Sequence, residues 1–212
     1  MNMKIEKPLL RGHFHQAMFF VSLGACILLV LRADSRIETI STIVYSLGAL
    51  TMYGISALYH RVTWSPERRL FMKKLDHAAI YIMIAGTFTP ITQLALPPES
   101  GKTLLISIWG IALLGMVQSI FFVNLPKIVS AILYLIAGYM IAPYFSELIP
   151  RIGSTNIMLI IAGGLAYSIG AIAYGLKRPV FNPKYFGYHE FFHIMVCIGS
   201  IFHFGVIYSI LN

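Results

Sequence analysis

The chain has 212 residues, of which 58% are hydrophobic and only 11% are charged, and its formal net charge is +8. Its mean hydropathy of +0.76 is too high for a soluble domain of this size, which excludes an ordinary soluble protein. A positive balance in a membrane protein is typical of cytoplasmic loops, so we expect no nucleic-acid partner. Cys26 and Cys197 fall within apolar runs, where a thiol behaves as a small hydrophobic group, and they predict no disulfide.

The apolar runs predict membrane-spanning helices. A helix needs about 20 apolar residues to cross a bilayer. Lipid offers no partner for backbone N–H and C=O groups, so each run must be helical unless the chain forms a closed barrel, and the period-two alternation of a barrel is absent. We predict an all-α, seven-transmembrane helix bundle that forms a single integral membrane domain over residues 1–212. The predicted spans are residues 14–31, 39–59, 77–96, 103–123, 128–145, 157–176 and 190–211.

The basic residues predict the orientation of this bundle. Residues 1–13 resemble a secretory signal, but no small-residue cleavage site follows, and we expect a retained first span. Twelve Lys and Arg residues fall on the N-terminal side of the bundle and four on the other side. Since cytoplasmic loops carry the excess of Lys and Arg, we predict a cytoplasmic N-terminus and a C-terminus outside. The twelve are Lys4, Lys7, Arg11, Arg61, Arg68, Arg69, Lys73, Lys74, Lys127, Lys177, Arg178 and Lys184.

Polar side chains gather at the predicted cytoplasmic end of three spans. A polar residue inside a span is costly, so its position is informative. The charge count used only Lys and Arg, yet it places imidazoles and a carboxylate from distant segments at one membrane depth. The residues are Ser56 and His60 in the second span, Asp76 and His77 at the third, and His189, Glu190 and His193 at the seventh.

The spacing of three histidines predicts a metal site. His189 and His193 are four residues apart, so they lie on one helix face with a spacing suited to one tetrahedral metal. His60, from another helix, would be a third ligand and leave a fourth position open. Three protein ligands plus water are typical of a catalytic zinc site, whereas a structural site is closed. We therefore predict zinc, although other divalent metals also bind such ligands.

Residues 189–193, HEFFH, also fit the H-E-x-x-H pattern of zinc proteases, in which the Glu is the general base. An intramembrane protease of that type needs a later Asp ligand, and no Asp follows Asp76 in this chain. We interpret Glu190 as a neighbour of the site or as a solvated side chain, with a role as base as the remaining alternative.

Simpler interpretations apply to the other histidines. A lone histidine near a membrane interface usually snorkels toward the headgroups or forms hydrogen bonds, and we expect this of His13, His15 and His203. His203 lies ten residues beyond His193, which is about 15 Å further along a helix. His77 is interpreted as a packing neighbour of the site.

Asp76 and Ser56 also have alternatives. Asp76 could pair with Lys73 or Lys74 at a helix start, where a carboxylate is favoured. Ser56 could donate to the backbone carbonyl four residues earlier, as hydroxyl groups in spans often do. The residues alone leave both alternatives open.

Three segments carry a resemblance to a known family. They are SALYH at 56–60, LDHAAIYIMIAGTFTPI at 75–91 and HEFFHIMVCIGSIFHF at 189–204. In this order, within seven spans, they resemble the haemolysin III branch of the progestin and adipoQ receptor (PAQR) family. The likeness extends from the second span to the seventh.

The resemblance implies a role for each polar residue. His60, His189 and His193 would bind an intramembrane zinc near the cytoplasmic face, Asp76 would hold the attacking water, and Ser56 would support the site from nearby. Adiponectin receptors and, more distantly, alkaline ceramidases are similar, which implies hydrolysis of a lipid amide. The resemblance also implies a bacterial inner membrane and a role in membrane-lipid homeostasis.

Three hypotheses for function follow. The first is a zinc-dependent hydrolase of a lipid amide or ester, with Asp76 as general base and a membrane lipid as its partner. The second is a non-enzymatic sensor or structural membrane protein, in which zinc ties helices together and Asp76 fills the fourth position. The third is a haemolytic pore, which the scarcity of polar residues within the spans argues against. The sequence indicates no protein partner and leaves the oligomeric state open.

Overall fold

The computed structural model describes residues 7–211, so Lys4 of the charge count lies outside the described residues. The described chain is helical and contains no β-strand, which confirms the all-α prediction for this part of the chain. The elements are α1 (His13–Arg32), α2 (Arg36–Arg61), α3 (Pro66–Leu94), α4 (Pro98–Phe121), α5 (Lys127–Tyr139), the short 3₁₀ helix η1 (Ala142–Tyr144), α6 (Phe145–Leu176) and α7 (Tyr188–Ser209).

Capping residues set where the helices of the first half begin. At α2, Ser35 Oγ accepts from the backbone N–H of Glu38 at 3.2 Å, and Glu38 Oε2 accepts from that of Ser35 at 3.1 Å. This reciprocal pair satisfies two of the free donors of a helix start. Helix α3 begins at Pro66 after the N-cap Ser65, although the apolar run that predicts it begins only at residue 77. The charged first turns of α3 are therefore helical too.

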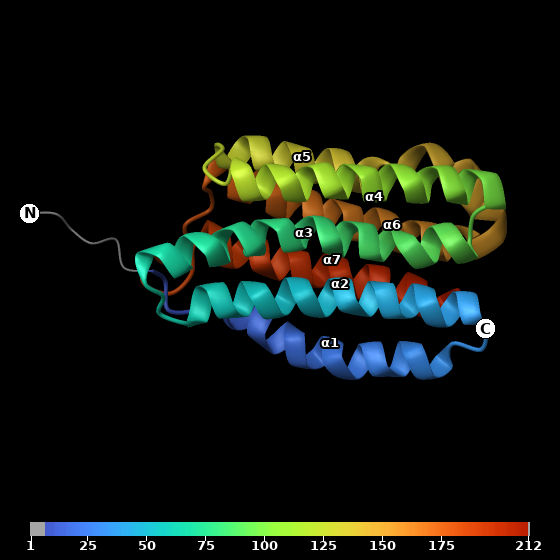
Figure 1. The fold of residues 1–212 in the computed structure, drawn as a ribbon, viewed down its shortest axis with the longest axis horizontal. Helices are drawn as coiled ribbons and strands as arrows, with labels where there is room; N and C mark the ends of the chain where they lie inside the picture. The colour runs from blue at the N-terminus through green and yellow to red at the C-terminus, as the bar shows by residue number, and fades with distance from the viewer. Residues whose placement is uncertain (1–6, 212) are drawn as a thin grey trace, which may run out of the picture.

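The helices lie side by side along the long axis of the molecule, and successive helices alternate in direction (Figure 1). Helix α2 packs against α3, and α6 packs against α7. Small residues allow the first of these contacts: a Cβ at Gly48 would lie 3.0 Å from the Ile82 carbonyl oxygen, and one at Gly86 would lie 3.2 Å from that of Val44. Such small residues at helix contacts are typical of membrane bundles.

The outer surface of the bundle is apolar. Leu31, Leu114 and Phe121 are 79%, 70% and 73% exposed, and many other large hydrophobic side chains point outward. A soluble protein rarely exposes so much continuous apolar surface, so this surface faces lipid. The chain is a multi-pass integral membrane protein.

Five helical stretches are long and apolar enough to cross a membrane among the residues that the structure describes. Helix α3 is not in this set, and α5, η1 and α6 count together as one stretch of 50 residues. The seven-span count and the orientation of the termini therefore stay predictions. The five stretches are His13–Arg32, Arg36–Arg61, Pro98–Phe121, Lys127–Leu176 and Tyr188–Ser209.

A break divides α6 near its start. Gly153 has φ +75° and ψ 163°, which is not helical, and Pro150 precedes it by three residues. Proline removes a backbone donor, and glycine adopts this backbone conformation without the steric cost that a side chain adds. The kink therefore has a local cause in the sequence.

Candidate metal centre

Three buried histidines converge at the end of the bundle where α7 begins. His60 lies in the last turn of α2, and His189 and His193 lie in the first two turns of α7. One nitrogen from each ring lies within 4.8 Å of the other two, and the Nε2 atoms of His60 and His189 are 3.2 Å apart. The three side chains are 7%, 9% and 1% exposed, in the order named. The fold thus brings together the three residues that the sequence predicts as metal ligands.

The spacing of the His60 and His189 nitrogens fits a zinc ion. A Zn–N distance of about 2.0–2.1 Å puts two nitrogens of a tetrahedral site about 3.3 Å apart, and the His60–His189 pair is 3.2 Å apart. Imidazole nitrogens are common ligands of zinc and of other divalent metals. The three buried imidazoles could therefore hold a divalent cation.

Glu190 fixes the start of α7 and with it the register of the two histidines on that helix. Its Oε2 accepts from the backbone N–H of Gly187 at 2.8 Å, and its Oε1 accepts from Arg11 Nε. Glu190 is fully buried. Its interpretation as a solvated side chain is therefore wrong, because Arg11 compensates its charge and lets it lie inside the bundle. It is a neighbour of the site that ties α7 to the residues before α1.

The segment before α1 also closes over His60. The backbone N–H groups of Leu9 and Leu10 donate to the carbonyl groups of Lys184 and Tyr185 in the loop before α7. Gly12 then has φ +83°, and a Cβ there would lie 2.6 Å from His60 Cβ. Glycine is the residue that fits this left-handed backbone at such a close approach.

Asp76 lies beside the cluster without being part of it. Its Oδ2 is 3.9 Å from His60 Nε2, which is too long for a hydrogen bond. Among residues 7–211 no ion pair joins Asp76 to Lys73 or Lys74, and Lys73 donates to Asn124 instead. The lysine pairing considered from the sequence is therefore not formed.

A cavity of about 220 Å³ leads from the histidines into the bundle. Ser56, Asp76 and His77 lie on its wall together with His189 and His193, and apolar side chains from α3, α5, α6 and α7 form most of the rest. Ser56 and Asp76 are both buried.

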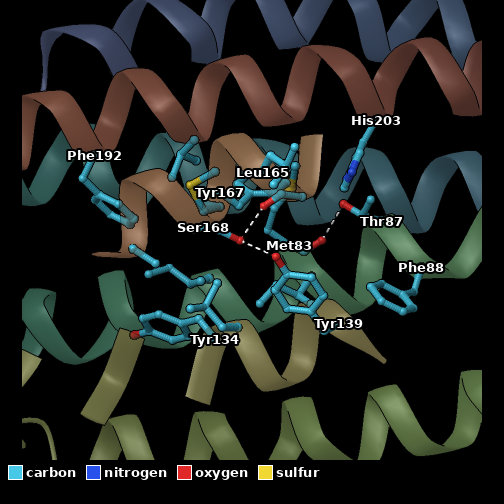
Figure 2. Close-up of a pocket in the computed structure, with 18 of the residues that line it drawn as sticks. Met83, Thr87, Phe88, Tyr134, Tyr139, Leu165, Tyr167, Ser168, Phe192 and His203 are labelled. Carbon is cyan, nitrogen blue, oxygen red and sulfur yellow. Dashed lines mark hydrogen bonds between the residues drawn. The ribbon is translucent and has the colours of Figure 1, made fainter. Parts of the chain in front are cut away.

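The cavity runs along α7 for some distance. Its wall includes His203, which lies about 15 Å beyond His193 on the helix. His203 Nε2 contacts the Ile160 carbonyl oxygen at 3.2 Å, in agreement with the hydrogen-bonding role expected from the sequence. Figure 2 shows Tyr139 and Ser168 pointing toward each other on the same wall, with their hydroxyl oxygens 2.8 Å apart.

His15 is the residue of this region that the sequence interpretation missed. Instead of lying at the interface, it is 2% exposed and its ring stacks on that of His193, with centroids 3.8 Å apart and planes at 10°. A lone histidine has no partner at a helical spacing, so no motif marks it. Its one signal is its place at the start of the first span, at the same depth as the other histidines.

Comparison with known proteins agrees with this architecture. A family profile described as haemolysin-III related matches residues 3–204. Hemolysin-3 of Bacillus cereus is 32% identical over 200 residues, covering 92% of this chain and 88% of that protein. Hemolysin-3 homolog of Bacillus subtilis (strain 168) is 30% identical over 199 residues, covering 92% and 90%.

A more distant relative is the heptahelical transmembrane protein ADIPOR2 of Oryza sativa subsp. japonica, which is 28% identical over 190 residues, covering 80% of this chain and 81% of that protein. The haemolysin III match extends over nearly the whole chain. The proteins of the adiponectin receptor type are similar to this chain at lower sequence identity. The chain belongs to the haemolysin-III related family of membrane proteins.

Proposed function

We propose that the protein is a zinc-dependent hydrolase of a lipid amide or ester and that its substrate is a membrane lipid. One observation carries this proposal: a buried cluster of three imidazoles lies at one end of an apolar cavity inside a bundle whose outer surface faces lipid. Ligand sites are typically apolar cavities with a few converging polar groups. An acyl chain suits the apolar wall, and its carbonyl group would lie at the histidines.

Zinc held by three histidines would supply Lewis-acid activation of a water molecule and of the scissile carbonyl group. The protein supplies the remaining groups. Asp76 does not belong to the three-nitrogen cluster, yet its carboxylate lies 3.9 Å from His60 Nε2 on the wall of the cavity. At this distance the carboxylate is close enough to accept a hydrogen bond from a water molecule bound at the cluster, which is the role expected in an open catalytic site.

In this mechanism Asp76 is the general base that takes a proton from the attacking water. Ser56 supports the site from the same wall of the cavity, where its hydroxyl is available to orient the Asp76 carboxylate. Asp76→Asn keeps the shape of the side chain but removes its basicity, so it should retain zinc and lose turnover. Zinc content and fatty-acid release are measured on the same preparation.

We also propose that the bundle crosses the membrane seven times, with the N-terminus cytoplasmic and the C-terminus outside. Support comes from the heptahelical rice relative, from the seven α-helices of residues 7–211 and from the excess of basic residues on the N-terminal side. The Bacillus relatives support a bacterial plasma membrane. The histidine cluster would then lie near the cytoplasmic face.

The test is metal analysis of the purified protein together with fatty-acid release from a panel of lipid amides and esters. We expect zinc close to one ion per chain in the wild type, release from at least one lipid, and loss of both in His193→Ala. His203→Ala is the matched control for zinc content, because His203 lies on the same helix but about 15 Å from His193. Equal release by wild type and His193→Ala would reject the proposal.

A further inference from the structure

His15 lies against the proposed metal site, although it comes from a different helix than the three ligands. It is the third residue of α1, and its ring contacts the face of His193 and, at 5.2 Å between centroids and 80° between planes, the ring of Tyr53. Neither ring nitrogen of His15 has a hydrogen-bond partner within residues 7–211. Its buried position is thus maintained by ring packing.

The stacked geometry excludes His15 as a fourth ligand in this arrangement. The lone pair of an imidazole nitrogen lies in the plane of the ring. Two nearly parallel rings 3.8 Å apart therefore direct their lone pairs side by side, not toward one point. In agreement, no nitrogen of His15 belongs to the group of ligand atoms within 4.8 Å of one another.

His193 lacks the hydrogen bond that usually holds the ring of a metal-binding histidine in place. A metal-binding histidine almost always donates its second ring nitrogen to a carboxylate or a carbonyl group, which fixes the ring. The torsion that turns the His193 ring has broad minima, and its buried Nδ1 has no partner within residues 7–211. The flat ring of His15 covers one face of His193 and opposes that rotation.

We propose that His15 is a positioning residue, which fixes the ring of His193 by stacking and so pre-organises the three-histidine site. This inference rests on the proposed metal site. The position of His15 is itself fixed, because the segment before α1 is tied to α7 by the Arg11–Glu190 ion pair and closes over His60 at Gly12. The packing of α1 against α7 then holds the His15 ring against that of His193.

The experiment compares the zinc affinity of full-length wild type, His15→Ala and His15→Phe in detergent, by competition with a chromophoric chelator. Outer contacts of this kind change metal affinity about 10–100-fold, and we expect such a loss in His15→Ala. His15→Phe keeps a flat ring without nitrogens, so it should stay within about threefold of the wild type. His203→Ala, a buried histidine on the same cavity wall, should leave the affinity unchanged.

A second measurement separates positioning from general destabilisation. The visible spectrum of bound Co²⁺ reports the geometry of its ligands, so it should change in His15→Ala and be restored in His15→Phe. Thermal unfolding of the metal-free proteins checks their folding. If His15→Ala fails to fold, His15→Leu replaces it, because leucine fills the volume without offering a flat ring.

The outcomes are distinct. Equal zinc affinity and equal Co²⁺ spectra for wild type and His15→Ala would overturn the role of His15 and leave the metal site intact. An equal loss in His15→Phe and His15→Ala would also overturn it, because a nitrogen of His15 would then act directly. Absence of zinc and Co²⁺ binding by the wild type would overturn the metal site itself, and this inference with it.

Discussion

The ion pair between Arg11 and Glu190 allows a quantitative test of how the metal-site end of the bundle is held together. The two residues are 179 positions apart in the sequence, and their side chains are 18% and 0% exposed. Arg11→Ala removes the charge partner and leaves the carboxylate buried beside the backbone N–H of Gly187. Glu190→Gln instead keeps an acceptor for that N–H and leaves an arginine that can turn toward water.

The two changes should therefore differ in cost. Removing one partner of a buried pair costs about 3–5 kcal/mol, and we expect about 3 kcal/mol for Arg11→Ala, since water can enter where the arginine stood. Glu190→Gln should cost about 1 kcal/mol, the value of one hydrogen bond. In a chain of this size each kcal/mol lowers Tm by about 2–4 °C, which gives losses of about 6–12 °C and about 2–4 °C.

The assay is thermal unfolding of the protein in detergent, followed by far-ultraviolet circular dichroism. The double variant Arg11→Ala/Glu190→Gln should melt at a higher temperature than Arg11→Ala, because the uncompensated charge is gone. Arg68→Ala, which removes an exposed arginine of α3, should change the free energy of unfolding by less than about 0.5 kcal/mol. A Glu190→Gln variant that melts below Arg11→Ala would refute this account of the pair.

Further predictions concern single residues. Gly12→Ala strains a left-handed backbone and places a Cβ against His60. The free energy of unfolding should fall by about 1–2 kcal/mol and Tm by about 2–8 °C, and chelator competition should show weaker zinc binding. Unchanged zinc affinity would contradict the close approach of Gly12 to His60. Ser35→Ala removes the N-cap of α2 and should cost about 1 kcal/mol in thermal unfolding, with Ser35→Asp neutral. Gly163→Ala places a Cβ against the His203 ring and should cost about 1–3 kcal/mol by the same measurement, whereas Gly163→Ala in a His203→Ala background should cost less.

Hydropathy alone predicted the helices of the apolar runs, because an unpaired backbone group in lipid is so costly that few structures are possible. The same criterion placed the start of α3 at residue 77, eleven residues after its observed start at Pro66. The earlier start is indicated by local capping signals, namely Ser65 followed by Pro66 and Glu67. These lie in a charged segment, which a hydropathy criterion does not detect as a helix. The same criterion placed a connection between spans at residues 146–156, whereas the structure is helical from Phe145 onward and breaks at Gly153.

The candidate site was predictable for residues that are close in sequence and for residues that lie at the same end of their membrane spans. His189 and His193 share a face because they are four residues apart, and His60 lies at the same end because its span ends there. Glu190 was ambiguous because its partner, Arg11, is 179 residues away. No spacing rule connects residues whose contact depends on how α1 packs against α7.

The sequence by itself determined that this is an α-helical membrane protein of the haemolysin III type, and it identified three histidines that lie close enough to share a metal. Composition indicates the membrane helices through the solvent they require, and helical spacing pairs His189 with His193 through neighbouring turns. The motifs at 56–60, 75–91 and 189–204 carry the resemblance to the family. Only the tertiary structure decided that Glu190 is buried and paired, that Asp76 lies beside the cluster without joining it, and that His15 stacks on His193. Those contacts join different helices, and their geometry exists only once the bundle has packed.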